Sequence, residues 1–268
     1  MQKDILPELT PAEIKRYSRH TIIEKVGEIG QRKLKAASVL IIGNGGLGSP
    51  IALYLAAAGI GHIGLVDFDT VDDSNLQRQV IHDTHNIGNL KVDSAKKRML
   101  SINPTMQIKT FPTAYSIENA EEIGAEYDLI LDGSDNFQTR YLINDYCVLH
   151  KKPYVYGSVF EFEGQVSVFD AQTGPCYRCI FPAPPPADSI PKTIGVFGVL
   201  PGTIGTIQSA EAIKLILGIG ETLQGYLMLY DALDSSFHKI QIGKNPDCAV
   251  CGTTPEIQSL EDGSSFYR

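Results

Sequence analysis

The stretch that decides the fold is Ser38-Val39-Leu40-Ile41-Ile42, an apolar and mostly β-branched run that leads directly into Gly43-Asn44-Gly45-Gly46-Leu47-Gly48. Its composition predicts a buried strand that ends in a tight turn. Residues 49–58 are rich in helix formers and stop at Gly59, which is typical of the position just after a helix. Residues 62–67 predict the next strand, so a strand, a helix and a strand follow within about thirty residues. Such a unit is a right-handed crossover between parallel strands.

The same alternation continues along the chain. Helix patterns cover 91–101 and 136–149, and strand patterns cover 108–111, 127–132 and 153–156. At 164–169 apolar and polar residues alternate, which is typical of an antiparallel strand. Thr10-Pro11-Ala12-Glu13 has the form of a capping box and predicts a short helix through His20. We therefore expect an α/β fold: a Rossmann-like, mostly parallel sheet with helices on both faces and an antiparallel C-terminal extension.

Length and charge exclude several classes of protein. With 268 residues, 43% hydrophobic and 20% charged, the chain is globular rather than disordered or fibrous. A net charge of −8 and a pI near 5.2 disfavour nucleic acid and anionic membrane surfaces as partners. Glycines interrupt both long uncharged stretches, so we expect no membrane span, and the first residues lack the apolar segment of a secretory signal. These features predict a cytoplasmic protein with reduced cysteines.

The glycine-rich turn fits the G-x-G-x-x-G pattern through Gly43, Gly45, Gly46 and Gly48. It stands between a strand and a helix, where glycines leave backbone N–H groups open to a phosphate. Asp67 and Asp69 follow about 20 residues later at the end of the next strand, where a carboxylate can accept hydrogen bonds from ribose hydroxyls. The pattern favours a nucleotide site over simple packing of a tight turn, but it does not separate NAD from ATP.

Three charged side chains favour a triphosphate. Arg78 and Lys91 follow the second strand, and a departing pyrophosphate needs guanidinium and ammonium groups that a nicotinamide cofactor does not. The alternative for each is a solvated surface charge. Asp135 follows the strand at 127–132, so it faces the same crevice, where a carboxylate can hold Mg²⁺. The alternative for Asp135 is the N-cap of the next helix, and both roles are compatible.

Four of the five cysteines form two C-x-x-C pairs, Cys176 with Cys179 and Cys248 with Cys251. Two such pairs are the ligand pattern of a tetrahedral Cys₄ zinc site, which in a reducing compartment is favoured over disulfides. Because the pairs lie far apart in the sequence, zinc would join two distant segments and be structural. The fifth cysteine, Cys147, lies in an apolar helix pattern and is expected in the core.

In this order the motifs resemble the MoeB/ThiF/HesA family, the adenylyltransferases of molybdopterin and thiazole synthesis that are related to ubiquitin-activating enzymes. The resemblance spans about residues 10–252. It rests on the glycine-rich turn, Asp67-Phe68-Asp69, Ser74-Asn75-Leu76-x-Arg78-Gln79, Lys91, Asp132-x-Ser134-Asp135-Asn136, Pro175-Cys-Tyr-x-Cys and the closing C-x-x-C. It implies ATP-dependent adenylylation of the C-terminal glycine of a ubiquitin-like sulfur-carrier protein that ends in Gly-Gly, with release of pyrophosphate. The carrier of molybdenum cofactor biosynthesis is the first expectation, and a thiamine or tRNA-thiolation carrier is the alternative.

The resemblance also implies roles for single residues. Gly46 would lie against the phosphates, Asp67 would bind the ribose, Asn75, Arg78 and Lys91 would hold the triphosphate, and Asp135 would coordinate Mg²⁺. Ser74 and Asn136 belong to the same motifs and are expected at the ATP site. Asp135, Arg78 and Lys91 are the catalytic candidates. The family is homodimeric, and Arg19 matches an arginine that reaches the partner's nucleotide; a helix surface charge is the alternative.

The expected organisation is a single adenylyltransferase domain over 1–268. It comprises an N-terminal helical arm (10–35), a nucleotide-binding half (36–160), a carrier-binding and zinc half (161–252) and a tail (253–268). Few residues follow Cys251, so we expect no fused sulfurtransferase domain and a separate persulfide sulfur donor. The sequence does not identify the carrier.

One segment departs from the family pattern. Many relatives carry a cysteine in the crossover loop, whereas residues 189–194 here read Ser-Ile-Pro-Lys-Thr-Ile. We therefore expect adenylylation to be the only covalent chemistry. Three other readings are disfavoured. An NAD-dependent oxidoreductase leaves the cations and the cysteine pairs unexplained, a non-catalytic nucleotide-binding scaffold has no need for intact phosphate ligands, and a tRNA-modifying dehydratase does not fit the two C-x-x-C pairs.

Overall fold

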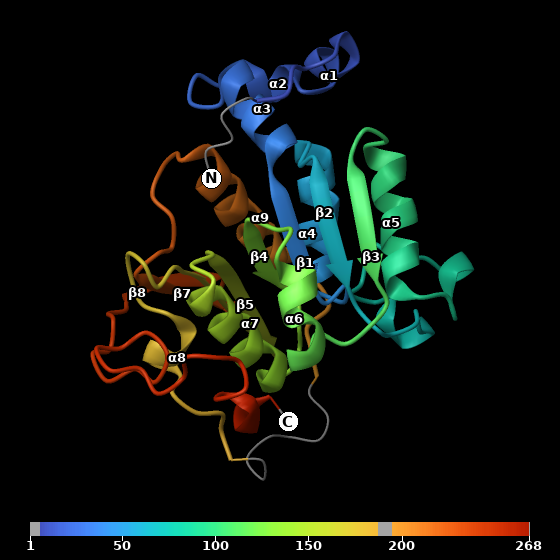
Figure 1. The fold of residues 1–268 in the computed structure, drawn as a ribbon. Helices are drawn as coiled ribbons and strands as arrows, with labels where there is room; N and C mark the ends of the chain where they lie inside the picture. Colours follow the sequence, from blue (N-terminus) through green and yellow to red (C-terminus); the bar gives the residue numbers. More distant parts are fainter. Residues whose placement is uncertain (1–5, 187–194, 268) are drawn as a thin grey trace.

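The structure is a computed structural model that describes residues 6–186 and 195–267, and these form one eight-stranded sheet with helices on both faces (Figure 1). The strands are β1 (Ser38–Ile42), β2 (His62–Val66), β3 (Gln107–Phe111), β4 (Leu129–Asp132), β5 (Tyr154–Phe160), β6 (Glu163–Phe169), β7 (Tyr226–Asp231) and β8 (Ser236–Gln241). The helices are α1 (Pro11–Arg16), α2 (Ser18–Thr21), α3 (Gly27–Ala36), α4 (Gly48–Ala58), α5 (Lys91–Ile102), α6 (Ile117–Gly124), α7 (Phe137–Leu149), α8 (Tyr177–Ile180) and α9 (Leu200–Leu217). Short 3₁₀ turns cover η1 (Asp73–Asn75), η2 (Thr84–Asn86) and η4 (Ser264–Phe266).

The strand order is β3-β2-β1-β4-β5-β6-β7-β8. Strands β1 to β5 run parallel, whereas β6, β7 and β8 are each antiparallel to the strand before them. Ile41 of β1 lies opposite Leu65 of β2 on one side and Leu131 of β4 on the other. From β1 the strand order runs outward through β2 to β3, and from β4 it runs outward on the other side through β5. Because the order reverses between β1 and β4, a crevice is expected at their carboxyl ends. The predicted α/β fold with an antiparallel extension is confirmed.

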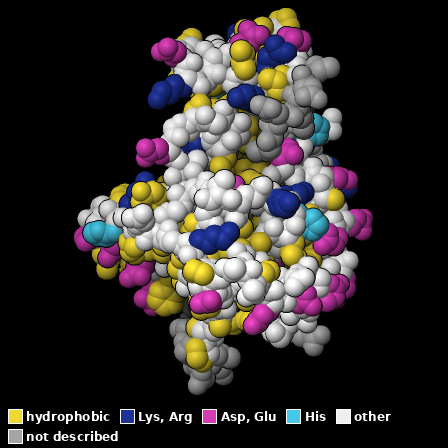
Figure 2. Space-filling model, turned by 60° about the vertical axis from the view of Figure 1, so that its left-hand side comes forward, with side chains coloured by type: hydrophobic (Ala, Val, Ile, Leu, Met, Phe, Trp, Pro, Cys, Tyr) yellow, Lys and Arg dark blue, Asp and Glu magenta, His cyan; other side chains and the backbone are white. Residues whose placement is uncertain are grey.

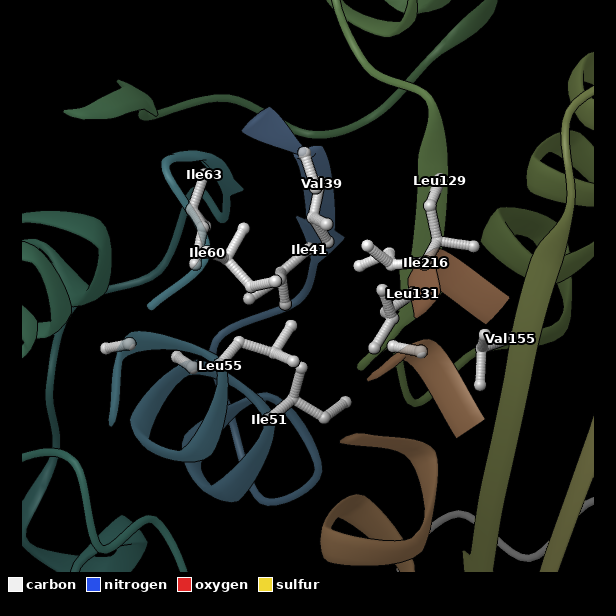
Figure 3. Packing of buried hydrophobic residues seen from close by; sticks show 14 of the residues in the cluster. Val39, Ile41, Ile51, Leu55, Ile60, Ile63, Leu129, Leu131, Val155 and Ile216 are labelled. Carbon is white, nitrogen blue, oxygen red and sulfur yellow. The ribbon is translucent and has the colours of Figure 1, made fainter. Parts of the chain in front are cut away.

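Helices α4, α5 and α9 cover one face of the parallel strands. Figure 3 shows Ile51 and Leu55 of α4 and Ile216 of α9 directed at the same face that carries Ile41 and Leu131. Alternate residues of each central strand point to this face, and the residues between them point to the other. A strand buried on both faces must be apolar throughout, which explains the unbroken run at 38–42.

The opposite face is covered by α6 and α7 and is rich in tyrosine. Tyr141 and Tyr146 of α7 and Tyr154 and Tyr156 of β5 are all buried there. Several of these rings meet edge to face or tilted, as Tyr141 does with Tyr177 at a centroid separation of 5.2 Å. Such contacts add to the burial of apolar surface and make α7 a rigid support for the residues at its start.

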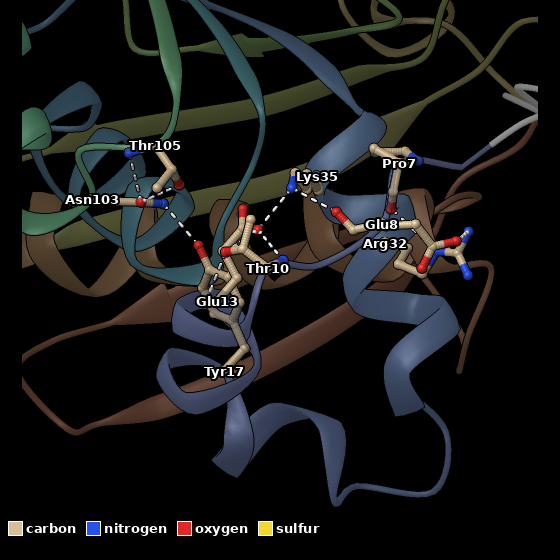
Figure 4. A network of polar contacts seen from close by, with 9 residues as sticks. All are labelled: Pro7, Glu8, Thr10, Glu13, Tyr17, Arg32, Lys35, Asn103 and Thr105. Atoms are coloured by element: carbon tan, nitrogen blue, oxygen red, sulfur yellow. Dashed lines mark hydrogen bonds and ion pairs between the residues drawn. The ribbon is translucent and has the colours of Figure 1, made fainter.

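The N-terminal arm packs at the amino ends of the parallel strands (Figures 1 and 4). The capping box is present: the Thr10 side chain accepts from the N–H of Glu13, and the Glu13 carboxylate accepts from the N–H of Thr10. The predicted single helix through His20 is wrong, because the chain breaks at Tyr17 into α1 and α2. The Tyr17 ring is buried, and its hydroxyl accepts a hydrogen bond from the Asn103 side chain at 2.9 Å. Tyr17 thus anchors the arm at the point where the helix is interrupted.

Ion pairs fasten α1 and the residues just before it to α3, as Figure 4 shows. Lys35 pairs with the buried carboxylate of Glu13 at 2.7 Å, and its ammonium also donates to the carbonyl oxygen of Glu8. Arg32 pairs with the Glu8 carboxylate at 2.7 Å. The start of the arm is therefore held to α3 by contacts that no local sequence pattern indicates.

A group of large apolar side chains is exposed on β8, at the end of β5 and on the segments beside the antiparallel strands. They are Phe160, Phe162, Phe197, Leu233, Phe237 and Ile240. Figure 2 turns this side of the molecule toward the viewer and shows apolar side chains among interspersed acidic and basic ones. Among the described residues that this view shows, the basic side chains lie scattered rather than in a continuous stripe.

Among the described residues, no helix is both long enough and apolar enough to cross a membrane.

Candidate active site and candidate metal centre

A cavity of about 570 Å³ lies at the carboxyl ends of β1, β2 and β4. This is the place where the strand order reverses, and open α/β sheets bind ligands there. Its walls include most of the predicted site residues, namely Gly43, Gly45, Gly46, Asp67, Asp69, Arg78, Lys91, Asp135 and Asn136. The predicted residues that do not line it are Gly48, Ser74, Asn75 and Arg19.

The glycines of the turn act in two different ways. Gly43 has a φ of +90°, and a Cβ atom there would lie 2.5 Å from the carbonyl oxygen of Gly133. A Cβ on Gly48 would overlap the carbonyl oxygen of Gly43. These two glycines thus allow the close crossing of chain segments under the cavity. Gly45 and Gly46 line the cavity itself and leave their backbone open to a ligand.

Asp67 is held rigidly at the end of β2. Its carboxylate accepts from the N–H of Asn44 at 2.7 Å and from the N–H of Asp69 at 2.9 Å. Burial raises the pKa of Asp67, while these two bonds oppose that rise. Each carboxylate oxygen keeps a further lone pair, so Asp67 can accept hydrogen bonds from a ribose.

Asp69 forms an ion pair with Lys91. The Lys91 ammonium lies 2.8 Å from the Asp69 carboxylate, and the Lys91 N–H donates to the Asp69 carbonyl oxygen. The Lys91 side chain is 7% exposed and that of Asp69 is 49% exposed. The pair fixes the ammonium at the cavity wall at the start of α5.

Arg78 lines the cavity beside Gly46, whereas Ser74 and Asn75 form the η1 turn below it. Arg78 donates to the carbonyl oxygen of Ser74 at 3.2 Å. The Asn75 side chain accepts from the N–H of Asp72 in a capping box. In this structure Ser74 and Asn75 therefore shape the segment that carries Arg78.

Asp135 and Asn136 stand at the start of α7, both exposed toward the cavity. The N-cap of α7 is Asn136, whose side chain accepts from the N–H of Thr139 at 2.8 Å. The alternative reading of Asp135 as the N-cap is therefore wrong. Its carboxylate can hold a cation, because a hard oxygen ligand in a polar cavity suits Mg²⁺.

Sequence reasoning missed a buried charge pair in the cavity wall. Arg140 on α7 lines the cavity while only 7% exposed, and its Nε lies 3.7 Å from the carboxylate of the fully buried Asp132. Burial raises the pKa of Asp132, and the Arg140 charge opposes that rise. Asp132 also accepts from the hydroxyls of Ser134 and Tyr154, so it braces the turn that carries Asp135. No spacing in the sequence indicates this pair, because its partners come from different elements.

The four paired cysteines meet in one cluster. The Sγ atoms of Cys176 and Cys248 are 3.6 Å apart, those of Cys179 and Cys251 are 3.4 Å apart, and all four lie within 4.8 Å of one another. These separations are too long for disulfides, and all four cysteines are free. Tetrahedral zinc with Zn–S bonds of about 2.3 Å places sulfurs roughly 3.8 Å apart. The cluster therefore fits a Cys₄ metal site that joins α8 to the segment after β8.

Cys147 lies in α7 and is buried among the tyrosines of that face. Burial raises the pKa of its thiol far above the ordinary range. This agrees with the predicted core role and makes the thiol a poor nucleophile. The crossover-loop residues 189–194, where the family cysteine is missing, lie outside the described residues.

Arg19 is exposed on α2, in the arm at the amino ends of the strands. The cavity lies at the carboxyl ends, so the sheet separates Arg19 from the cavity of its own chain.

The profile of the ThiF family matches residues 17–250. The chain belongs to the ThiF family. The family predicted from the motifs is thereby confirmed.

Among the relatives of this ThiF-family chain, the sulfur carrier protein adenylyltransferase of Thermus thermophilus is 48% identical over 264 residues, covering 96% of this chain and 97% of the relative. The probable adenylyltransferase/sulfurtransferase MoeZ of Mycobacterium tuberculosis is 50% identical over 264 residues, covering 96% of this chain. The adenylyltransferase and sulfurtransferase MOCS3 of Culex quinquefasciatus is 45% identical over 268 residues, covering 99% of this chain. This chain spans only 66% of MoeZ and 61% of MOCS3.

Among solved structures, a crystal structure of Escherichia coli MccB with MccA-N7isoASN superposes with a TM-score of 0.81 at 24% identity. The match covers 89% of this chain and 75% of MccB. At this identity the likeness shows a shared fold.

Proposed function

We propose that this ThiF-family protein is an ATP-dependent adenylyltransferase that activates the C-terminal glycine of a ubiquitin-like sulfur-carrier protein. The observation that carries the proposal is one cavity lined by the open glycine-rich turn, two cationic side chains and a carboxylate that does not cap α7. Those groups are Gly45 and Gly46, Arg78 and Lys91, and Asp135. The names of the relatives support the class of reaction.

In the proposed reaction a carboxylate oxygen of the terminal glycine attacks the α-phosphorus of ATP. The new P–O bond forms as the bond from the α-phosphorus to the bridging oxygen breaks, and pyrophosphate leaves with that electron pair. The glycine carboxylate is already ionised near neutral pH, so no general base is required. The protein's task is therefore alignment and neutralisation of charge.

Each group of the cavity has a place in that task. The N–H groups of Gly45 and Gly46 face the phosphates, Asp67 binds the ribose, and Arg78 and Lys91 neutralise the departing pyrophosphate. Asp135 would hold Mg²⁺, which when bound neutralises phosphate charge. Ser74, Asn75 and Asn136 support these residues from η1 and from the start of α7.

The exposed apolar group on the antiparallel extension supports a docking site for the carrier. Phe160 and Phe197 of that group directly follow Val159 and Val196, and these two valines line the cavity. A carrier seated there could pass a narrow Gly-Gly tail past the valines to the α-phosphate. In this proposal the 36–160 half binds the nucleotide and the 161–252 half binds the carrier and zinc.

Further parts of the proposal concern the assembly. The four-cysteine cluster would hold one structural Zn²⁺ through Cys176, Cys179, Cys248 and Cys251. A homodimer would let Arg19 reach the partner's nucleotide, since the sheet keeps it from its own cavity. The sulfur would come from a separate persulfide donor. Free cysteines throughout the described residues suit the cytoplasm.

The carrier of molybdenum cofactor biosynthesis is the proposed substrate, and thiamine or tRNA-thiolation carriers are the alternatives. The test is ATP–pyrophosphate exchange with a panel of purified carriers, each also trimmed of its Gly-Gly tail. Exchange with the molybdopterin-type carrier and its loss on trimming are expected. Stronger exchange with another carrier would reassign the substrate, and exchange unaffected by trimming would contradict the proposal.

A further inference from the structure

His82 is buried between the glycine-rich turn and α5, beside the residues that line the cavity. It is 6% exposed and does not line the cavity. Its Nε2 lies 3.0 Å from the carbonyl oxygen of Asn44 in the glycine-rich turn, and its Nδ1 lies 2.8 Å from the hydroxyl of Ser94 on α5. Its own segment carries Arg78, and α5 begins at Lys91. One imidazole therefore links the glycine-rich turn, the Arg78 segment and the Lys91 helix.

The two contacts determine the form of the ring. The Asn44 carbonyl oxygen can only accept, so Nε2 carries the hydrogen and donates it. In the neutral ring Nδ1 then accepts from the Ser94 hydroxyl. Burial, together with the nearby charge of Lys91, holds the pKa of His82 below its usual value. Near neutral pH the ring is therefore neutral with a fixed tautomer.

The contact with Asn44 bears on the neighbouring glycine. In a trans peptide unit the C=O of one residue and the N–H of the next point in opposite directions. When His82 holds the Asn44 carbonyl inward, the N–H of Gly45 is directed outward, and Gly45 lines the cavity. Asn44 is fixed on its other side as well, because its own N–H donates to Asp67. The Asn44 N–H belongs to the preceding peptide unit, so Asp67 holds the Gly43–Asn44 peptide and His82 holds the Asn44–Gly45 peptide.

We propose that His82 is a positioning residue for ATP, which holds the Asn44–Gly45 peptide so that the Gly45 N–H faces the phosphates. This proposal rests on the proposed function, in which the glycine-rich turn binds those phosphates. A purely structural histidine would satisfy two buried polar groups and leave the affinity for ATP unchanged.

A pair of substitutions separates these roles. In His82→Gln the side-chain amide nitrogen stands as many bonds from Cβ as Nε2 does, so it can still donate to Asn44. In His82→Asn the polar atoms stand where Nδ1 does, so Ser94 keeps its partner and the Asn44 carbonyl loses its donor. Both variants lose one buried hydrogen bond and the aromatic ring, so both are expected to lower the melting temperature.

Two measurements use these variants of the full chain. Hydrogen exchange of the ligand-free protein is expected to show faster exchange at residues 43–48 in His82→Asn and not in His82→Gln. Titration with a non-hydrolysable ATP analogue should show about tenfold weaker binding in His82→Asn and affinity near wild type in His82→Gln. Equal effects of the two variants on exchange and affinity would overturn the proposal.

Two further results keep the interpretation clear. If the wild-type protein binds no ATP analogue, the proposed function fails, while the exchange data still decide whether His82 holds the turn. If His82→Asn does not fold, His82→Leu takes its place, because leucine offers the Asn44 carbonyl no donor, with His82→Gln still as the control. Weaker ATP binding in His82→Leu than in His82→Gln supports the proposal, and equal binding in both variants overturns it.

Discussion

Replacing Lys91 by methionine tests the neutralisation of the leaving pyrophosphate. Methionine keeps a long apolar stem in a position where the lysine side chain is 7% exposed, and it removes the ammonium. The lost ion pair with Asp69 costs little stability, because the Asp69 side chain is 49% exposed and such pairs contribute under about 1 kcal/mol. For a chain of this size that corresponds to a shift in melting temperature of no more than roughly 4 °C.

The effect on the reaction should be much larger. A preorganised donor facing developing phosphate charge is worth about 2.7–4 kcal/mol, or roughly 10²–10³ in rate. Lys91→Met should therefore lower carrier-dependent ATP–pyrophosphate exchange by that factor while the protein stays folded. Lys97→Met is the matched control, because Lys97 is exposed on the same helix. Exchange near wild type in Lys91→Met would make Lys91 a structural partner of Asp69 and refute the reasoning.

Three further predictions follow from the same geometry. Asp135→Ala should abolish exchange and leave the melting temperature nearly unchanged, because Asn136 still caps α7; normal exchange would remove Asp135 from the site. Metal analysis of freshly purified protein should find about one zinc per chain, and Cys179→Ser should lose it and melt at a lower temperature; protein without zinc would overturn the metal site. Cys147→Ala should keep exchange at a stability cost of roughly 1 kcal/mol; a thiol-sensitive enzyme–carrier adduct that disappears in this variant would make Cys147 a nucleophile.

The strands and helices that position the cavity could be predicted from local patterns. The run at 38–42 is apolar because β1 is buried on both faces, and the glycines after it mark the crossing with Gly133. The two cysteine pairs likewise predict that all four cysteines lie together, because C-x-x-C spacing is typical of the ligands of one metal ion. In each case a short local pattern marks the constraint, although Gly133 and the second cysteine pair lie far away in the sequence.

Features that no local pattern marks could not be predicted in this way. The break of the arm helix at Tyr17 is set by Asn103, and the use of His82 is set by Asn44, which lies 38 residues earlier. In the sequence Arg140 is one residue of an apolar helix pattern, and only the folded structure brings it beside Asp132. The exposed apolar face of the extension was also missed, because exposure depends on what covers a strand.

The transfer of AMP to the carrier can be measured directly. Enzyme, magnesium, carrier and ATP labelled on the α-phosphate are incubated together, and the carrier is examined by intact mass spectrometry and for label. The proposed reaction predicts a carrier heavier by one AMP, labelled at its C-terminal glycine, and no such species when the Gly-Gly tail is trimmed. Label on the enzyme in place of the carrier, or an unmodified carrier after ATP has been consumed, would contradict it.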